Sequence, residues 1–184
     1  MLAVVAAAMT FSSCEDPALS GIYGDTLVYM PQAAHNLGID NNLKFNLVKS
    51  KVDENALHQS QTTLGIYRSS TAPKESFSVD LKVDADSLLR AQTIAQEPDA
   101  EAKYNIYKSA ILLDEKYYEP LPEKLTVKNG ERQATTQLIL KDADLYADYP
   151  IGQILCLPVR IENPTKYQLN ESLSFTMVVV TLGE

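Results

Sequence analysis

The stretch Gly152-Gln-Ile-Leu-Cys-Leu-Pro-Val-Arg-Ile-Glu-Asn163 carries the clearest secondary-structure signal in the chain. Every second residue in it is a large hydrophobe, namely Leu155, Leu157, Val159 and Ile161. Successive side chains of a β-strand point to opposite faces, so these four are predicted to share one buried face. Their burial contributes roughly 6–12 kcal/mol at about 1.5–3 kcal/mol each, an upper estimate because unfolded chains already hide some apolar surface.

The other face of the same strand changes character along its length. Ile154 and Cys156 make its beginning apolar, whereas Arg160 and Glu162 make its end polar. A strand that is buried on both faces at one end and wet on one face at the other is typical of a β-sandwich.

Composition limits the class of protein and its partners. A chain of 184 residues with 45% hydrophobic and 22% charged residues is long enough, and apolar enough, for one globular domain with a real core. With 16 Lys and Arg against 24 Asp and Glu, the formal net charge is −8. Since this charge repels phosphate backbones and no basic cluster offsets it, we expect no nucleic-acid partner.

Short hydrophobic segments separated by turn residues continue through the chain. They lie at residues 26–30, 43–47, 62–67, 77–83, 124–127, 133–140, 155–161 and 175–182. Their spacing predicts a mainly β fold, an immunoglobulin-like β-sandwich of about seven strands with one or two helical connections.

Two segments have helical rather than strand periodicity, and one turn is distinctive. Asp84 or Asp86 can cap a helix that ends at Glu97-Pro98-Asp99, and residues 142–149 form a short helical turn before Pro150. Asn129-Gly130 is typical of a tight hairpin, so the strands on either side of it are expected to pair.

The N-terminus has the pattern of an export signal. Leu2 to Phe11 is apolar except for Thr10, and ten helical residues rise only about 15 Å, too short for a bilayer core of roughly 30 Å. Phe11-Ser12-Ser13-Cys14 resembles a bacterial lipobox, in which cleavage leaves Cys14 to carry acyl chains such as palmitate. The alternative is a buried N-terminal strand or helix. We therefore assign residues 1–13 to a lipoprotein signal peptide, 14–24 to a tether and 25–184 to the β-sandwich domain.

An ordered set of short motifs resembles one protein family. The set comprises Val28-Tyr29-Met30, the strand 77–83 leading into a helix, Tyr117-Tyr118-Glu-Pro-Leu-Pro, Leu125-Thr-Val127, Asn129-Gly130-Glu131, the strand 155–161 and the final strand 175–180. It is similar to the N-terminal domain of Bacteroidetes surface lipoproteins known as the domain of unknown function 1735, over roughly residues 26–182.

This resemblance implies a location and a set of partners. Family members resemble parts of polysaccharide-utilisation systems, so we expect a lipid-anchored protein of the outer membrane that faces the cell exterior. Its expected partners are that membrane, oligosaccharides and outer-membrane glycan-uptake proteins. In such relatives the hydrolase chemistry belongs to a separate C-terminal module, so the resemblance implies no enzymatic activity for this domain.

The residues themselves point to no catalytic centre. His35 and His58 are the only histidines, and Cys156, flanked by Leu155 and Leu157, is expected to be a buried, inert thiol. Asp142, Asp144 and Asp148 lack the glycine and terminal glutamate of an EF-hand, so we predict no metal site and no cofactor.

A group of tyrosines provides the candidate ligand-binding residues: Tyr104, Tyr107, Tyr117 and Tyr118. Aromatic faces stack on sugar rings when they lie on exposed loops. The alternative, which we place first, is that these rings cap the core. Two functions remain open, namely accessory binding of neutral glycans, and a structural or adhesion role through a sheet edge.

Replacing the expected lipid-bearing residue tests the anchoring prediction. Cys14→Ser removes the acylation site, so we expect this variant to move from the membrane fraction to the soluble fraction when cells are fractionated without detergent. If the wild-type protein is already soluble under these conditions, the anchoring prediction is wrong.

Overall fold

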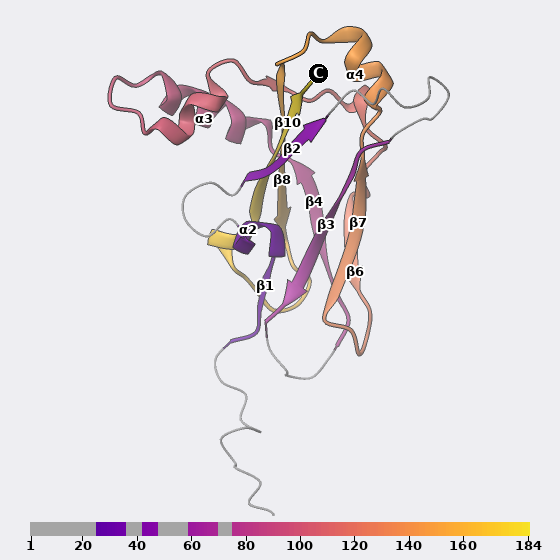
Figure 1. The fold of residues 1–184 in the computed structure, drawn as a ribbon. Coiled ribbons are helices and arrows are strands. Elements are labelled where there is room, and N and C mark those ends of the chain that lie inside the picture. The colour runs from indigo at the N-terminus through magenta and orange to yellow at the C-terminus, as the bar shows by residue number, and fades with distance from the viewer. Residues whose placement is uncertain (1–24, 36–41, 48–58, 70–74) are drawn as a thin grey trace, which may run out of the picture.

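The structure, a computed structural model, describes residues 25–35, 42–47, 59–69 and 75–184. The predicted signal peptide, tether and Cys14 lie outside these residues. The described part is mainly β, with two sheets and few helices, so the predicted fold class is confirmed (Figure 1). Every helix in this part of the chain is too short or too polar to cross a bilayer.

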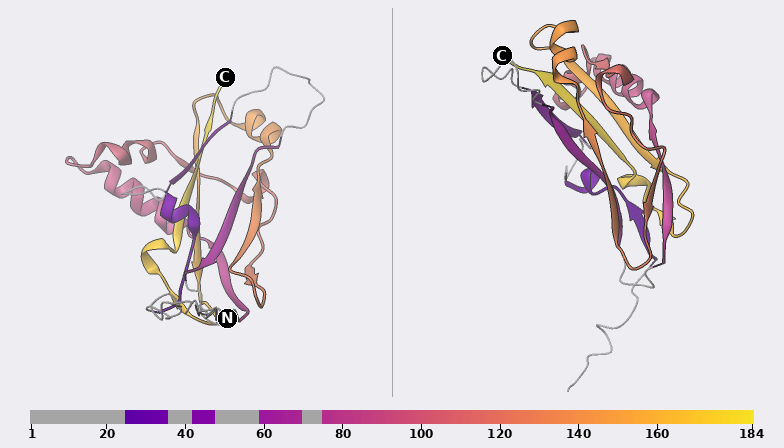
Figure 2. Two further views of the ribbon diagram at one scale, coloured as in Figure 1. Left: turned by 60° about the horizontal axis from the view of Figure 1, so that its bottom comes forward. Right: turned by 90° about the vertical axis from the view of Figure 1, so that its right-hand side faces the viewer.

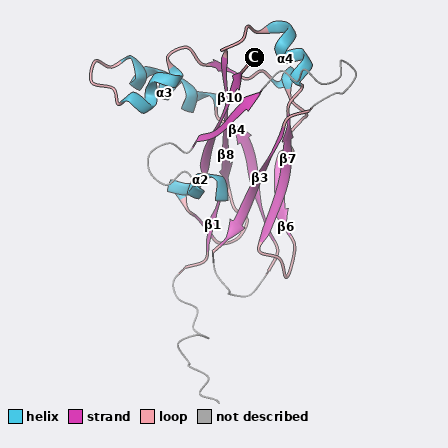
Figure 3. Cartoon of the chain, in the orientation of Figure 1, coloured by secondary structure: helices cyan, strands magenta, loops and turns pink. Residues whose placement is uncertain are grey.

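The strands form two sheets whose long axes run together, with the helices toward one end (Figure 3). The smaller sheet has the order β7 (Gln133–Ile139), β3 (Gln61–Arg68), β1 (Leu27–Tyr29) and β9 (Gln168–Leu169). The larger sheet has the order β2 (Asn42–Leu47), β10 (Phe175–Leu182), β8 (Ile154–Glu162), β4 (Phe77–Val83) and β6 (Lys124–Val127), with β5 (Ile111–Leu112) also on β8.

The core between the sheets contains the residues that the opening stretch predicts. Leu155, Leu157, Val159 and Ile161 are all 0% exposed. They meet side chains of the smaller sheet such as Val28, Leu64 and Ile66 in one cluster. The alternation read from β8 therefore defines the inner face of the larger sheet.

A second, smaller core lies on the outer face of the larger sheet. Helix α3 (Ala85–Gln96) and the 3-10 helix η1 (Ala102–Tyr107) lie to one side of the sheets (Figure 2). Leu88 and Ala95 of α3 pack there with Cys156, Met177 and Val179 of β8 and β10. Because this helical unit covers only one end of the outer face, β8 is buried on both faces there and partly exposed at Arg160 and Glu162.

The helical unit is inserted between two segments that contact the same strand. The chain leaves the sheet where the amide of Asp84 donates to the carbonyl of Pro158 at 3.0 Å. It returns at β5, after which the amide of Leu113 donates to the carbonyl of Cys156 at 2.9 Å. Since β4 is antiparallel and β5 parallel to β8, the chain reverses direction relative to β8 during this excursion.

The remaining helices are short. They are α2 (Pro31–His35), α4 (Asp142–Asp148), η2 (Glu115–Tyr117) and η3 (Glu171–Leu173). The helix expected after Asp84 and the helical turn before Pro150 are confirmed as α3 and α4.

Two details of the sequence prediction are wrong. The described residues contain ten strands rather than about seven, partly because β5 and β9 have only two residues each, too few for a periodic pattern. The strands on either side of Asn129-Gly130 do not form a hairpin ladder, because β6 and β7 belong to different sheets. The turn itself exists, with a positive φ of 86° at Gly130 and a 3.0 Å hydrogen bond from the Glu131 amide to the Lys128 carbonyl.

Cys156 is a direct reporter of the cover formed by α3. Burial raises the pKa of its thiol to about 12, so little thiolate is present near neutral pH. In a Cys14→Ser background, where Cys156 is the sole thiol, we expect a thiol reagent to label the folded protein far more slowly than a free peptide. Leu88→Ala, which removes a buried α3 contact, should accelerate labelling, whereas Leu89→Ala, at a position 62% exposed, should not. Labelling of the wild type at the peptide rate would contradict the placement of α3.

Candidate functional site

The Tyr118 groove lies where β4 loses its pairing with β6. The β4–β6 ladder extends from Phe77 to Asp80, and beyond it only the Leu81 amide donates to the Glu123 carbonyl, at 2.8 Å. The groove has a volume of about 600 Å³ and is lined by Leu81, Lys82, Val83, Asp114, Glu115, Lys116, Tyr118, Pro120, Leu121 and Glu123. This volume falls within the roughly 300–1,000 Å³ typical of small-molecule pockets.

The lining of the Tyr118 groove combines apolar and polar groups. Val83 is 41% exposed although it belongs to a strand, and Pro120 and Leu121 lie across the groove from the sheet segment. The carboxylates of Glu115 and Asp114 act on the Tyr118 hydroxyl: burial raises its pKa first, and these charges raise it further. The hydroxyl therefore stays protonated and can donate a hydrogen bond near neutral pH.

A second groove, the Arg160 groove, lies on the outer face of the larger sheet. It also has a volume of about 600 Å³ and is lined by Asp84, Arg90, Arg160, Ile161, Glu162, Asn163, Pro164, Leu169 and Glu171. Two guanidinium groups, three carboxylates and one amide give it a mostly polar lining, in contrast to the Tyr118 groove.

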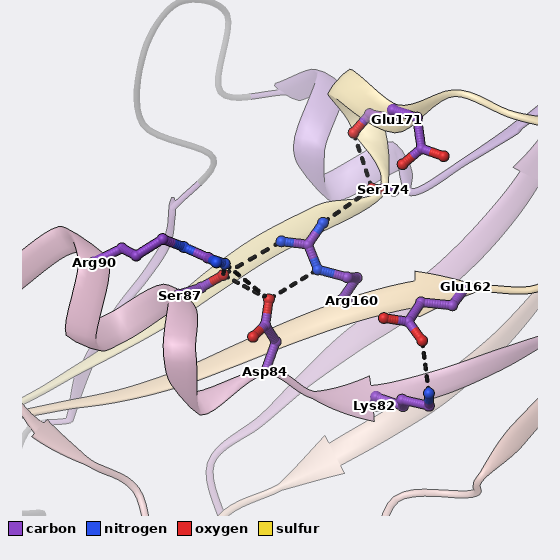
Figure 4. A network of polar contacts seen from close by, with 8 residues as sticks. All are labelled: Lys82, Asp84, Ser87, Arg90, Arg160, Glu162, Glu171 and Ser174. Carbon is purple, nitrogen blue, oxygen red and sulfur yellow. Dashed lines mark hydrogen bonds and ion pairs between the residues drawn. The ribbon is translucent and has the colours of Figure 1, made fainter.

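A hydrogen-bond network fixes Arg160 in this groove (Figure 4). The guanidinium donates to the Asp84 carboxylate at 2.8 Å, to the Ser87 hydroxyl at 3.3 Å and to the Ser174 hydroxyl at 3.5 Å. Its other side lies over the Phe175 ring, 5.1 Å from the centroid. Arg160 is thus held by β4, α3 and β10 together, which orients its planar donor group.

Asp84 is the common acceptor of this network. It receives hydrogen bonds from Arg160, from the Ser87 hydroxyl at 2.6 Å and from Arg90 at 3.4 Å. Burial alone would raise the pKa of Asp84, but Ser87 and the two arginines outweigh burial and lower it below its usual value of 3.8. Asp84 occupies the N-cap position expected for it, yet its side chain caps no backbone amide because Arg160 and Ser87 occupy the carboxylate.

The two grooves are neighbours across β4. Lys82 lines the Tyr118 groove, Glu162 lines the Arg160 groove, and the two side chains form an ion pair at 2.6 Å (Figure 4). The hydrogen bond to Glu162 raises the pKa of Lys82. One ion pair on the outer face therefore lies between an apolar groove and a polar groove.

The structure places Tyr117 and Tyr118 in the main core, 2% and 7% exposed. Tyr117 donates to Asp148 at 2.6 Å and packs against the Tyr149 ring, so it has the core-capping role that we placed first. Burial, and then the bond to Asp148, raise the pKa of Tyr117 to about 12. Tyr118 lines the groove, but so little of it is exposed that it offers an edge rather than a stacking face.

Tyr104 and Tyr107 belong to the other core, beside α3. Tyr107 is 4% exposed, and its ring lies 6.2 Å from the partly exposed ring of Tyr104. The four candidate tyrosines are therefore divided between two places and form no common stacking surface. Three of the four rings are buried, which leaves a stacking role open to Tyr104 alone.

Sequence reasoning missed Arg160, Asp84 and the groove-lining segment 114–123. Arg160 carried a detectable signal, because a cation that follows a run of buried residues within one strand needs an anion nearby. No pattern identified Asp84 as that anion, since the contact spans 76 residues. Among the described residues, no group of three or more His, Cys, Asp or Glu side chains is placed to hold a metal ion.

The fold defines a two-sheet β-sandwich domain with a helical unit on one outer face, and comparisons with known proteins identify its family. A family model described as an N-terminal domain matches residues 23–168, which is most of the chain. The chain belongs to this family, and the predicted membership of the domain of unknown function 1735 family is confirmed. None of the curated proteins matches the sequence.

Several solved structures share the fold at low sequence identity. A candidate carbohydrate-binding protein from Bacteroides ovatus superimposes with a TM-score of 0.54 at 14% identity, over 86% of this chain and 37% of that one. A protein of unknown function from Bacteroides ovatus gives 0.56 at 16% identity, over 85% and 46%. EndoBT-3987 of Bacteroides thetaiotaomicron, solved with a Man5GlcNAc product, gives 0.53 at 12% identity, over 84% and 30%. The chain therefore spans less than half the length of each.

The Asp84 network predicts a specific dependence of stability on pH. Because the pKa of Asp84 is lowered in the folded protein, its contribution is complete above the unfolded pKa and is lost as the pH falls through the folded pKa. Asp84→Asn should therefore destabilise the protein at neutral pH, and the difference from wild type should shrink below about pH 4. Urea unfolding at several pH values measures this, with the exposed Asp86→Asn as the control. A difference that does not change with pH would contradict the assignment.

Proposed function

We propose that this chain is a non-catalytic accessory domain that binds neutral oligosaccharides in the Tyr118 groove. The observation that carries the proposal is the lining of that groove. Apolar surface from Val83, Pro120 and Leu121 faces a cavity of about 600 Å³ that also contains charged side chains of both signs. A pyranose ring has apolar C–H faces and a rim of hydroxyls, so it matches a site with apolar walls and a few hydrogen-bonding groups.

Neutral glycans are favoured over acidic ones by charge. The chain has a formal net charge of −8, and Asp114, Glu115 and Glu123 contribute three carboxylates to the groove against the two cations Lys82 and Lys116. Lys116 is also paired with Asp148 at 2.9 Å, outside the groove lining. Anionic polysaccharides would be repelled, whereas neutral hydroxyls can donate to these carboxylates.

The family and its structural neighbours support a role in glycan handling. One neighbour is described as carbohydrate-binding and another was solved with a glycan product, although identities of 12–14% relate the folds and not the sites. We propose that the chain is displayed by a lipid on Cys14 at the outer face of the outer membrane, where it would work beside glycan-uptake proteins.

A second function, adhesion through a sheet edge, has one observation in its favour. Strand β7 ends the order of the smaller sheet and is paired along Gln133–Ile139 with β3 on one side. Its exposed residues Gln133, Thr135 and Gln137 are uncharged. Charged residues commonly protect edge strands from adding another chain, and their absence from these positions leaves β7 suited to strand addition.

Calorimetric titration of neutral oligosaccharides separates the two functions. We expect at least one two-unit gluco- or manno-oligosaccharide to bind the wild-type protein without release of new reducing ends. Val83→Asp places a charge on the exposed apolar wall and should abolish binding with little change in the thermal midpoint. Leu89→Asp, also at an exposed leucine but remote from the groove lining, should bind normally.

Tyr118→Ala provides the opposite signature. Its ring is buried in the main core, so truncation should destabilise the protein by about 3–5 kcal/mol, as for other large-to-small core changes. Absence of binding across the panel would exclude the glycan function. Capture of a protein partner that is lost in Thr135→Lys would then favour adhesion through β7.

A further inference from the structure

The Arg160 groove contains hydrogen-bonding capacity that the protein itself does not use. Arg160 carries five N–H donors, and its contacts with Asp84, Ser87 and Ser174 use three of them. Arg90 is 64% exposed, and Glu171 presents an exposed carboxylate in the same lining. Donors and acceptors are therefore available side by side.

The mixture of charges defines the chemistry of a suitable ligand. A carboxylate or phosphate would meet Asp84, Glu162 and Glu171, and a cation would meet Arg90 and Arg160. A hydroxyl group both donates and accepts, so it can satisfy either kind of partner without a charge of its own. Neighbouring hydroxyls on a neutral sugar fit this lining better than any ion does.

The groove is also pre-organised. Arg160 is held by residues from three elements and by the Phe175 ring, and its side chain is only 26% exposed. A donor that is already fixed loses less conformational entropy on binding than a free arginine does. This distinguishes Arg160 from a solvated surface cation.

We infer that the Tyr118 groove and the Arg160 groove form one extended site for a linear neutral oligosaccharide, which crosses β4 over the Lys82–Glu162 ion pair. This inference rests on the proposed function, because it assigns the first sugar units to the Tyr118 groove. The following units contact the Arg160 groove through their hydroxyls. The ligand class is thereby narrowed from a short sugar to a chain of several units.

Ligand length provides the test. Gluco- and manno-oligosaccharides of two and six units are titrated into the wild-type protein, and we expect the six-unit ligand to bind roughly tenfold more tightly, as a few added hydrogen bonds allow. Arg90→Ala/Glu171→Ala removes one exposed cation and one exposed anion from the Arg160 groove while Asp84 and Arg160 remain. It should reduce six-unit affinity to the two-unit level and leave two-unit affinity unchanged.

A matched control removes the same two charges elsewhere. Lys108→Ala/Glu97→Ala changes one exposed cation and one exposed anion outside both groove linings, and should retain the length dependence. Thermal midpoints verify that each variant is folded. If two-unit ligands bind and six-unit ligands bind no more tightly, the extended site is excluded and the Tyr118 groove stands. If no ligand binds, the proposed function itself fails, and the extended site fails with it.

Discussion

The burial of β8 on both faces is the constraint on which the rest of this structure depends. Its inner residues Leu155, Leu157, Val159 and Ile161 form the centre of the sandwich, and Cys156 requires a second layer on the outer face. Helix α3 and η1 supply that layer, but they cover only one end of the sheet. Arg160 lies just beyond the covered end, so it must find an anion at the point where α3 begins. The Asp84–Arg160 pair is thus a consequence of where the helical cover stops.

The two grooves follow from the same geometry. Strand β4 has to leave the sheet after Val83 to form α3, and its ladder with β6 has already ended at Asp80. The segment that returns after η1 contacts β8 through β5 and then passes the unpaired edge of β4, which leaves the Tyr118 groove between them. On the other side of β4, the uncovered polar part of the outer face forms the Arg160 groove. Binding sites at the interruption of a regular sheet have apolar and polar groups at once, as glycan recognition requires.

Much of the fold could be predicted because it is written in local periodicity. Alternation identified the long strands, and the change to helical spacing after Val83 identified α3. The two-residue strands β5 and β9 have no period to detect, and the Asn129-Gly130 turn joins two sheets because burial of β6 and β7 in opposite layers outweighs the local preference for a hairpin. The candidate site was harder to predict. Tyrosine-rich sequence suggested stacking, but Tyr107, Tyr117 and Tyr118 are more stable buried, and the contact between Asp84 and Arg160 joins residues too far apart for any local pattern.

The central claim is that the region around the end of β4 binds neutral glycan. An amide chemical-shift titration with a neutral six-unit oligosaccharide tests it most directly, because it reports the position of the ligand on the protein. The account predicts perturbed amides at Lys82, Val83 and segment 114–123, continuing across Glu162 to Glu171, with β7 and the α3–η1 unit around Tyr104 unchanged. Perturbations confined to β7 or to Tyr104, or absent altogether at saturating ligand, would contradict it.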